Sequence, residues 1–224
     1  MAEIEIQRIG AKTLHIPIVG TSPLIMHNWS QKAKQQMLDA QQGRKKVKEI
    51  RDPAADYEAS FYRIASDGEP RYGFPVLGFK SATIGAARFY DKSVTMTMLR
   101  QCLFFTGLMT KADNQQLVEI IANDPDDPHM REDVVRLGQG STDLRYRAEF
   151  SSWEATLRVT YVESALSKAS VLSLIDAGGM GVGVGEWRPQ KGGEYGTFAL
   201  DSEREVVEVN TTPDVVADDG SQPN

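Results

Sequence analysis

The chain has 224 residues, a formal net charge of −6 and 41% hydrophobic residues. This length is enough for one large domain with a hydrophobic core of its own. No run of about eighteen apolar residues occurs, which excludes an ordinary membrane-spanning helix. The first residues lack the basic and apolar regions of a secretory signal, and the single cysteine, Cys102, cannot form an internal disulfide. We therefore expect a soluble, cytoplasmic protein.

The acidic charge is concentrated at the C-terminus. Residues 201–224 carry seven acidic side chains against one basic side chain, Arg204, so the rest of the chain is neutral. Within that neutral part, residues 28–51 carry seven basic side chains and two acidic ones. We predict one domain over 1–200, with a charged insertion at 28–70 and a disordered acidic tail. Such a tail can compete for a basic groove, recruit other subunits or simply aid solubility.

The first predicted elements are a strand over 13–19 and a helix over 30–42. Pro17 lies within the strand and indicates an edge or a bulge. The helix over 30–42 begins from a plausible N-cap at Ser30 but has few apolar positions. A further helix is predicted over 79–90, where apolar residues recur on one face.

The second half of the chain has the clearest strand signals. Short apolar strands are predicted over 101–108 and 117–122, and strict alternation over 144–162 predicts two strands joined by a bend at Ser151 and Ser152. A helix over 165–177, ended by Gly178 at its C′ position, and a strand over 195–200 complete the chain. Without the insertion, this order is the βαββαβ pattern of a ferredoxin-like α+β fold, which exposes one sheet face.

The most unusual segment is 178–196, which holds eight of the 19 glycines. Glycine allows close backbone approach and positive φ, so that successive N–H groups can contact a phosphate; Gly181, Gly183 and Gly185 are the candidates. A dinucleotide fingerprint or P-loop is excluded, because there the glycines follow a strand and precede a helix. A hairpin needed only for chain reversal is the alternative.

Three segments resemble the RAMP superfamily, the repeat-associated CRISPR proteins that include guide-RNA-lining backbone subunits. Residues 194–198, Glu-Tyr-Gly-Thr-Phe, resemble the family's Gly-aromatic-Gly-x-Phe ending, with Glu194 in place of the first glycine. Residues 74–82 keep the proline, the lysine and the helix of a Pro-Gly-Ser-Ser-Leu-Lys-Gly motif but lack its Gly-Ser-Ser core. The turn at 18–24 is similar in kind to the family's first loop. The departures and the small size indicate a divergent relative, for which a viral source is one option.

The resemblance implies that the first helix and the glycine-rich segment lie along the backbone of a single strand. It also implies that protomers stack side by side into a filament on guide RNA or single-stranded DNA. Cations for phosphates and flat side chains for bases would make the contacts. Besides the three glycines, the candidate binding residues are Lys32, Lys34, Arg44, Lys45, Lys46, Lys48, Lys80, Arg88, Arg145, Arg147, Trp187, Arg188 and Lys191.

Each candidate has an ordinary structural explanation as well. The charged side chains can be solvated or, for Arg145 and Arg147, paired across strands with Glu154 or its neighbours, and Trp187 can close the edge of the core. No cofactor or metal is expected, because the three histidines are scattered and the acidic loop over 124–133 lacks a calcium-loop spacing. We predict a binding protein, with a RAMP-type endoribonuclease or a structural scaffold protein as the alternatives.

Overall fold

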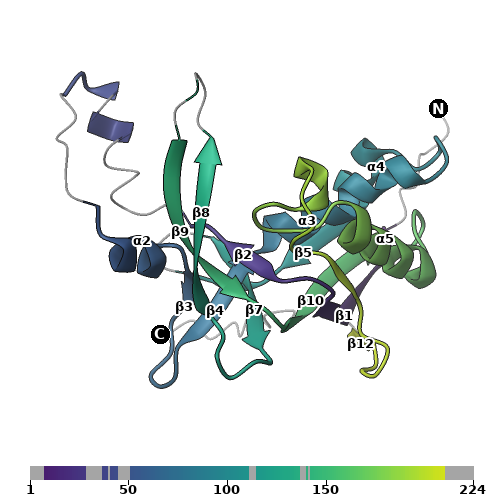
Figure 1. Ribbon diagram of the computed structural model, residues 1–224. Coiled ribbons are helices and arrows are strands. Elements are labelled where there is room, and N and C mark those ends of the chain that lie inside the picture. Colours follow the sequence, from purple (N-terminus) through teal and green to yellow (C-terminus); the bar gives the residue numbers. More distant parts are fainter. Residues whose placement is uncertain are drawn as a thin grey trace, which may run out of the picture.

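The computed structural model describes residues 8–28, 37–39, 41–44, 51–110, 115–136, 140 and 142–209. These residues confirm the α+β class and form two antiparallel sheets with helices (Figure 1). The larger sheet has the strand order β11-β1-β10-β7-β4-β3, and in addition β12 pairs with β1, β5 with β10 and β6 with β7. Its strands are β1 (Ala11–Gly20), β3 (Tyr62–Ile64), β4 (Arg71–Pro75), β5 (Leu103–Thr106), β6 (Leu108–Met109), β7 (Gln116–Ala122), β10 (Trp153–Val162), β11 (Phe198–Leu200) and β12 (Val207–Val209). The smaller sheet has the order β2-β9-β8, formed by β2 (Leu24–Met26), β8 (His129–Arg136) and β9 (Thr142–Phe150).

Strand β1 confirms the strand predicted at 13–19 and explains its proline. One edge of β1 pairs with β10, whereas the other edge pairs with β11 and, separately, with β12. Pro17 lies between these two short partners, where its carbonyl accepts a hydrogen bond from the N–H of Asp201 at 3.1 Å. Because proline has no N–H to donate, it is tolerated at this gap in the ladder.

The alternating segment 144–162 forms two strands, as predicted, but they belong to different sheets. Strand β9 pairs with β2 and β8, while β10 lies at the centre of the larger sheet. The chain crosses between the sheets at Ser151 and Ser152, whose N–H groups both donate to the buried carboxylate of Asp127, at 2.5 and 3.1 Å. Alternation reports which side of a strand is buried, but it does not report which neighbour the strand takes.

The helices that cover the larger sheet differ in their bounds from the prediction. Helix α3 (Val76–Gly85) continues into the 3-10 helix η1 (Ala86–Phe89), and α4 (Met96–Cys102) takes the first residues of the strand predicted at 101–108. Helix α5 (Lys168–Gly181) runs past Gly178, which is therefore a buried helical residue and not the C′ glycine. A methyl group at Gly178 would lie 2.6 Å from the carbonyl oxygen of Ala82, so glycine here allows α3 and α5 to pack closely.

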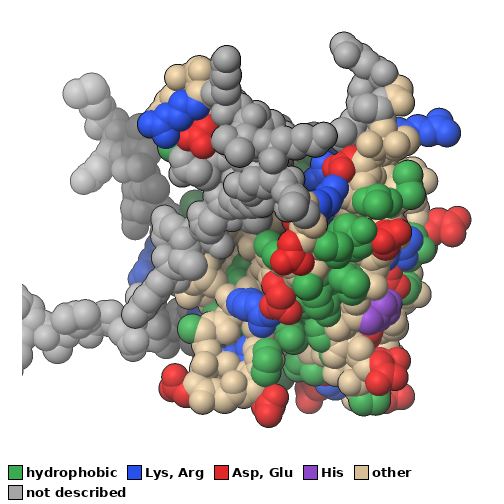
Figure 2. Space-filling model, turned by 60° about the vertical axis from the view of Figure 1, so that its left-hand side comes forward, with side chains coloured by type: hydrophobic (Ala, Val, Ile, Leu, Met, Phe, Trp, Pro, Cys, Tyr) green, Lys and Arg blue, Asp and Glu red, His purple; other side chains and the backbone are tan. Residues whose placement is uncertain are grey.

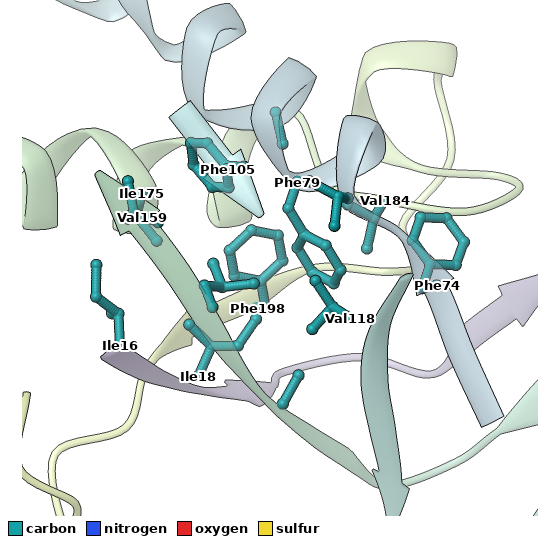
Figure 3. Packing of buried hydrophobic residues seen from close by; sticks show 14 of the residues in the cluster. Ile16, Ile18, Phe74, Phe79, Phe105, Val118, Val159, Ile175, Val184 and Phe198 are labelled. Carbon is teal, nitrogen blue, oxygen red and sulfur yellow. The ribbon is translucent and has the colours of Figure 1, made fainter. Parts of the chain in front are cut away.

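The core lies between the larger sheet and these helices (Figure 3). Phe79 of α3 points toward Phe198 and Val118, and its ring centroid is 5.6 Å from that of Phe198. Trp153 of β10 is fully buried, and its indole N–H donates to the carbonyl of Ser22 at 2.9 Å. Burial of large side chains of this kind stabilises a fold by about 1.5–3 kcal/mol each.

Two segments predicted to lie outside the core contribute to the fold. Within 28–70, helix α2 (Pro53–Ala59) precedes the buried residues Phe61 and Ile64, which are 4% and 8% exposed. Within the predicted tail, β12 pairs with β1, and Arg204 forms ion pairs with Glu154 and Asp201. The prediction of disorder is therefore wrong for 201–209, and residues 210–224 lie outside the described part of the chain. None of the helices in the described ranges is long and apolar enough to span a membrane.

Candidate nucleic-acid interface

A pocket of about 330 Å³ lies between the first half of α3 and the glycine-rich segment. Leu77, Gly78 and Ser81 line it from the helix, and Tyr62 and Phe74 form part of its wall. Its other lining residues are His27, Ala82, Val182, Gly183, Val184, Gly185, Glu186, Arg188 and Gln190. The helix predicted to follow a nucleic-acid backbone and the segment predicted to contact phosphates therefore face each other.

The glycine-rich segment is held against β2 and the residues that precede it. Gly196 donates its N–H to the carbonyl of Pro23 at 2.8 Å, and Glu186 donates its N–H to the carbonyl of Ile25 at 3.1 Å. The hydroxyl of Ser22 accepts a hydrogen bond from the N–H of Thr197 at 3.0 Å. Of the three segments that resemble the RAMP pattern, only 74–82 lines the pocket. Segments 18–24 and 194–198 hydrogen-bond to each other, and Gly196 accepts a hydrogen bond from the N–H of the pocket residue Val184 at 2.9 Å.

Two of the three candidate glycines line the pocket. Gly183 and Gly185 have φ values of 69° and 76°, which L-residues rarely adopt, and a methyl group at Gly185 would lie 2.6 Å from the carbonyl oxygen of Ile25. Gly181 is instead the last residue of α5 and packs against the ring of Phe89. Backbone conformation and close packing are enough to explain why these positions are glycines, without a phosphate contact. The shape of the pocket depends on Gly183 and Gly185.

Arg188 is the predicted cation that the structure places in the pocket. Its Nη1 donates to the carbonyl of Gly185 at 2.9 Å and its Nε donates to Oε1 of Gln190 at 3.2 Å. These contacts orient the guanidinium and leave further N–H donors for a ligand. Trp187 precedes it with a φ of 52°, an unusual value for a bulky residue, and its side chain is 40% exposed.

The other predicted cations of the described residues do not line the pocket. Lys80 lies over the ring of Phe104, with its Nζ 5.7 Å from the ring centroid, while Arg88 and Lys191 are exposed on η1 and the 3-10 helix η3 (Pro189–Lys191). Arg44 is exposed and pairs with Asp39 at 3.1 Å. Lys32, Lys34, Lys45, Lys46 and Lys48 lie outside the described residues. On the face drawn in Figure 2, the Lys and Arg side chains of the described residues are scattered among acidic and hydrophobic ones.

The prediction that Arg145 and Arg147 meet phosphates on an exposed sheet face is wrong for Arg147. That side chain is 4% exposed, and its Nη1 lies 3.2 Å from Oδ2 of Asp133. Asp133 and Glu149 in turn pair with Arg131 at 2.8 and 2.6 Å, so the facing side chains of β8 and β9 form a charged network. Arg145 is partly buried and pairs with Asp143 at 2.9 Å. Cross-strand pairing therefore accounts for Arg147, whereas Arg145 pairs within its own strand, and Glu154 is the partner of neither.

Two pocket residues were missed by sequence reasoning. Oε1 of Glu186 lies 3.5 Å from Nδ1 of His27, and Oε2 lies 3.7 Å from Nη2 of Arg147. The contact with His27 and the charge of Arg147 lower the pKa of Glu186 below its usual range, against the opposing effect of burial. Neither His27 nor Glu186 belongs to a sequence motif, and their contact could not be predicted because they are distant in the sequence and only the fold brings them together.

The acidic loop before β8 has a structural role. Asp127 caps the crossing between the sheets, and its Oδ1 lies 3.1 Å from Nδ1 of His129. Over the described ranges, no group of three His, Cys, Asp or Glu residues is arranged to hold a metal ion.

Comparisons with known proteins add little to this geometry. No family model matches the chain, and no curated protein matches it in sequence. Among solved structures, Cmr6 from Pyrococcus furiosus is similar with a TM-score of 0.38 and 11% sequence identity, over 88% of this chain and 100% of that chain. A likeness at this TM-score carries no inference, so the candidate interface rests on its own geometry.

Proposed function

We propose that this chain binds a single strand of nucleic acid across the pocket between α3 and the glycine-rich segment. The observation that carries the proposal is the position of Arg188, whose oriented guanidinium lies in a pocket walled by the backbone of Gly183 and Gly185. A guanidinium and closely approachable backbone are the groups that bind phosphate esters. Trp187, half-exposed beside them, offers a flat surface for a base.

The first turn of α3 supports the same proposal. Leu77 and Gly78 belong to this turn and line the pocket. Pro75 is the N-cap, and no side chain among the described residues caps the helix there. The N–H groups of a first turn have no partner within their helix and carry the positive end of its dipole, which favours a phosphate.

The fold that we propose for the core is ferredoxin-like. The elements β1, α3, β5, β10, α5 and β11 follow one another in the order strand, helix, strand, strand, helix, strand, with the other elements inserted between them. In space the four strands have the order β11-β1-β10-β5, and all neighbours are antiparallel. With the resemblance to RAMP backbone subunits, this arrangement supports side-by-side assembly of protomers on the strand, as a binding protein in the cytoplasm. The acidic tail would serve contacts with other subunits.

Fluorescence anisotropy with labelled RNA and DNA of one sequence, across a salt series, tests the proposal. If about three phosphates are neutralised per protomer, the log–log slope should be roughly −2, at ~0.7 counterions per single-strand contact. Failure to bind either strand at low salt would contradict the proposal and favour a scaffold protein.

A ribonuclease is the second candidate, favoured by one observation. His27 lines the pocket and is paired with the carboxylate of Glu186, an arrangement that can position an imidazole for proton transfer. Incubation of labelled RNA with excess protein should then give products that His27→Ala abolishes. Intact RNA after prolonged incubation would leave binding as the function.

A further inference from the structure

We propose that Glu186 makes the pocket selective for RNA by accepting a hydrogen bond from a ribose 2′-hydroxyl. This inference rests on the proposed binding of a single strand and names the residue that chooses between ribose and deoxyribose. The pocket contains the carboxylate of Glu186 as well as Arg188, the cation that would hold a phosphate.

The pocket carries both signs of charge. Arg188 and Glu186 are two residues apart in the chain and line the same pocket. A carboxylate repels phosphates, and when ionised it can only accept hydrogen bonds. The backbone of DNA has no hydrogen-bond donor, whereas every ribose of RNA has a 2′-hydroxyl. A strand that docks on Arg188 can therefore satisfy Glu186 through its sugar only if it is RNA.

Glu186 is fixed in position, but its carboxylate keeps the capacity to accept further hydrogen bonds. Its backbone N–H is bound to Ile25, and its two carboxylate oxygens contact His27 at 3.5 Å and Arg147 at 3.7 Å. Both distances exceed those of ordinary N–H···O hydrogen bonds. Arg147 also has a closer partner in Asp133, at 3.2 Å. The side chain of Glu186 is 40% exposed, so lone pairs remain available to a ligand.

The cost of docking DNA follows from desolvation. A strand lying over the pocket removes water from the exposed lone pairs of Glu186, which His27 and Arg147 contact only at 3.5 and 3.7 Å, and lone pairs that lose water without gaining a donor are unfavourable. Sites built to bind a hydroxyl reject the analogue that lacks it for this reason. A glutamate is ionised near neutral pH in any case, and the lowered pKa of Glu186 extends this rejection to more acidic pH.

The experiment compares RNA with 2′-fluoro RNA of the same sequence, which lacks the hydroxyl donor, and with DNA. Anisotropy is measured for the wild type, Glu186→Ala, Glu186→Gln and the control Glu194→Ala, an exposed acid of the same segment outside the pocket. We expect the wild type to bind RNA about tenfold more tightly than 2′-fluoro RNA, the effect of one hydrogen bond to a charged group. Glu186→Ala should bring the two within about twofold, and Glu194→Ala should keep the wild-type ratio.

The outcomes separate this inference from the proposed function. If the wild type binds no strand, the proposed function fails and this inference fails with it. If it binds RNA and 2′-fluoro RNA equally, only the role of Glu186 is overturned, and a ratio that survives in Glu186→Ala has the same meaning. Should Glu186→Ala not fold, Glu186→Gln serves instead, with an expected ratio of about threefold because a neutral amide oxygen accepts a weaker bond.

Discussion

The glycine-rich segment and the β8–β9 ladder both carry arginines that the sequence marks as phosphate ligands, but the fold uses them differently. Arg188 is oriented by a backbone carbonyl and lines a pocket, whereas Arg147 is buried among Asp133 and Glu186. The difference lies in the partners. An arginine that contacts carbonyl and amide oxygens keeps its charge available to a ligand, and one that contacts carboxylates has its charge neutralised.

The largest expected effect is on the buried arginine. Arg147→Ala leaves Asp133 with one partner fewer inside the fold, and breaking a buried pair costs about 3–5 kcal/mol of the free energy of unfolding. Arg145→Ala is the matched control in the same strand, where a partly exposed pair should contribute less than about 1 kcal/mol. Urea unfolding followed by circular dichroism measures both. If Arg147→Ala were as stable as wild type but bound nucleic acid more weakly, the contrast between the two regions would be lost.

The second effect concerns the shape of the glycine-rich segment. Gly185→Ala adds backbone strain at a positive φ and a contact of 2.6 Å with the carbonyl of Ile25, so we expect about 3 kcal/mol of destabilisation. Gly192→Ala is the control, because its φ is also positive, at 82°, but a methyl group there meets no atom of the described residues within 4 Å. Strain alone should cost about 1–2 kcal/mol. Equal losses in thermal unfolding would mean that packing against β2 does not hold the segment.

The third effect is on binding. Arg188→Ala should weaken binding of a single strand about tenfold and lower the salt slope by about 0.7, because one phosphate contact is lost. Arg100→Ala, which removes an exposed arginine from α4, is the charge-matched control and should change affinity less than about twofold. Anisotropy titrations at several salt concentrations measure both values. Equal losses in the two variants would indicate a general effect of charge with no defined site.

The smallest effect is on stability in acid. Because the pKa of Glu186 is lowered in the folded protein, its ionised form contributes stability above the ordinary glutamate range, and this is lost as the pH falls through the lower folded pKa. Glu186→Gln should therefore be less stable than wild type at neutral pH, and the difference should shrink as the pH falls below about 4. Melting temperatures across pH 3–7 measure this, and a difference that grows in acid would contradict the assigned sign.

The sequence predicts features that depend on neighbouring residues along the chain, and it does not predict features that depend on residues brought together by the fold. The strands at 13–19 and 144–162 were predicted from alternation, and the strand at 117–122 from a short apolar run, because both are properties of the strand itself. Helix α4 was missed because Gln101 and Cys102 precede an apolar run that favours a strand. The burial of Arg147 and the assignment of β9 to a second sheet depend on neighbours distant in sequence, which no local pattern reports.

The residues of the candidate site also fall into those that a local sequence pattern could predict and those that only the fold identifies. Arg188, Gly183 and Gly185 could be predicted because they stand together in one unusual segment. Lys80 could not be excluded, since only the fold shows that it lies over Phe104. The contact of His27 with Glu186 joins the residue that follows β2 to the glycine-rich segment. Neither residue could be identified before the fold placed both in the pocket.

Photo-crosslinking of a 4-thiouridine-labelled single strand, followed by mass spectrometry of the peptides, tests the central claim most directly. The proposed interface predicts crosslinks in 76–82 and 182–191, the two segments that supply most of the lining residues of the pocket, and their loss in Arg188→Ala. Crosslinks confined to 129–150, the β8–β9 ladder, would contradict it and would mean that the strand lies on the other region.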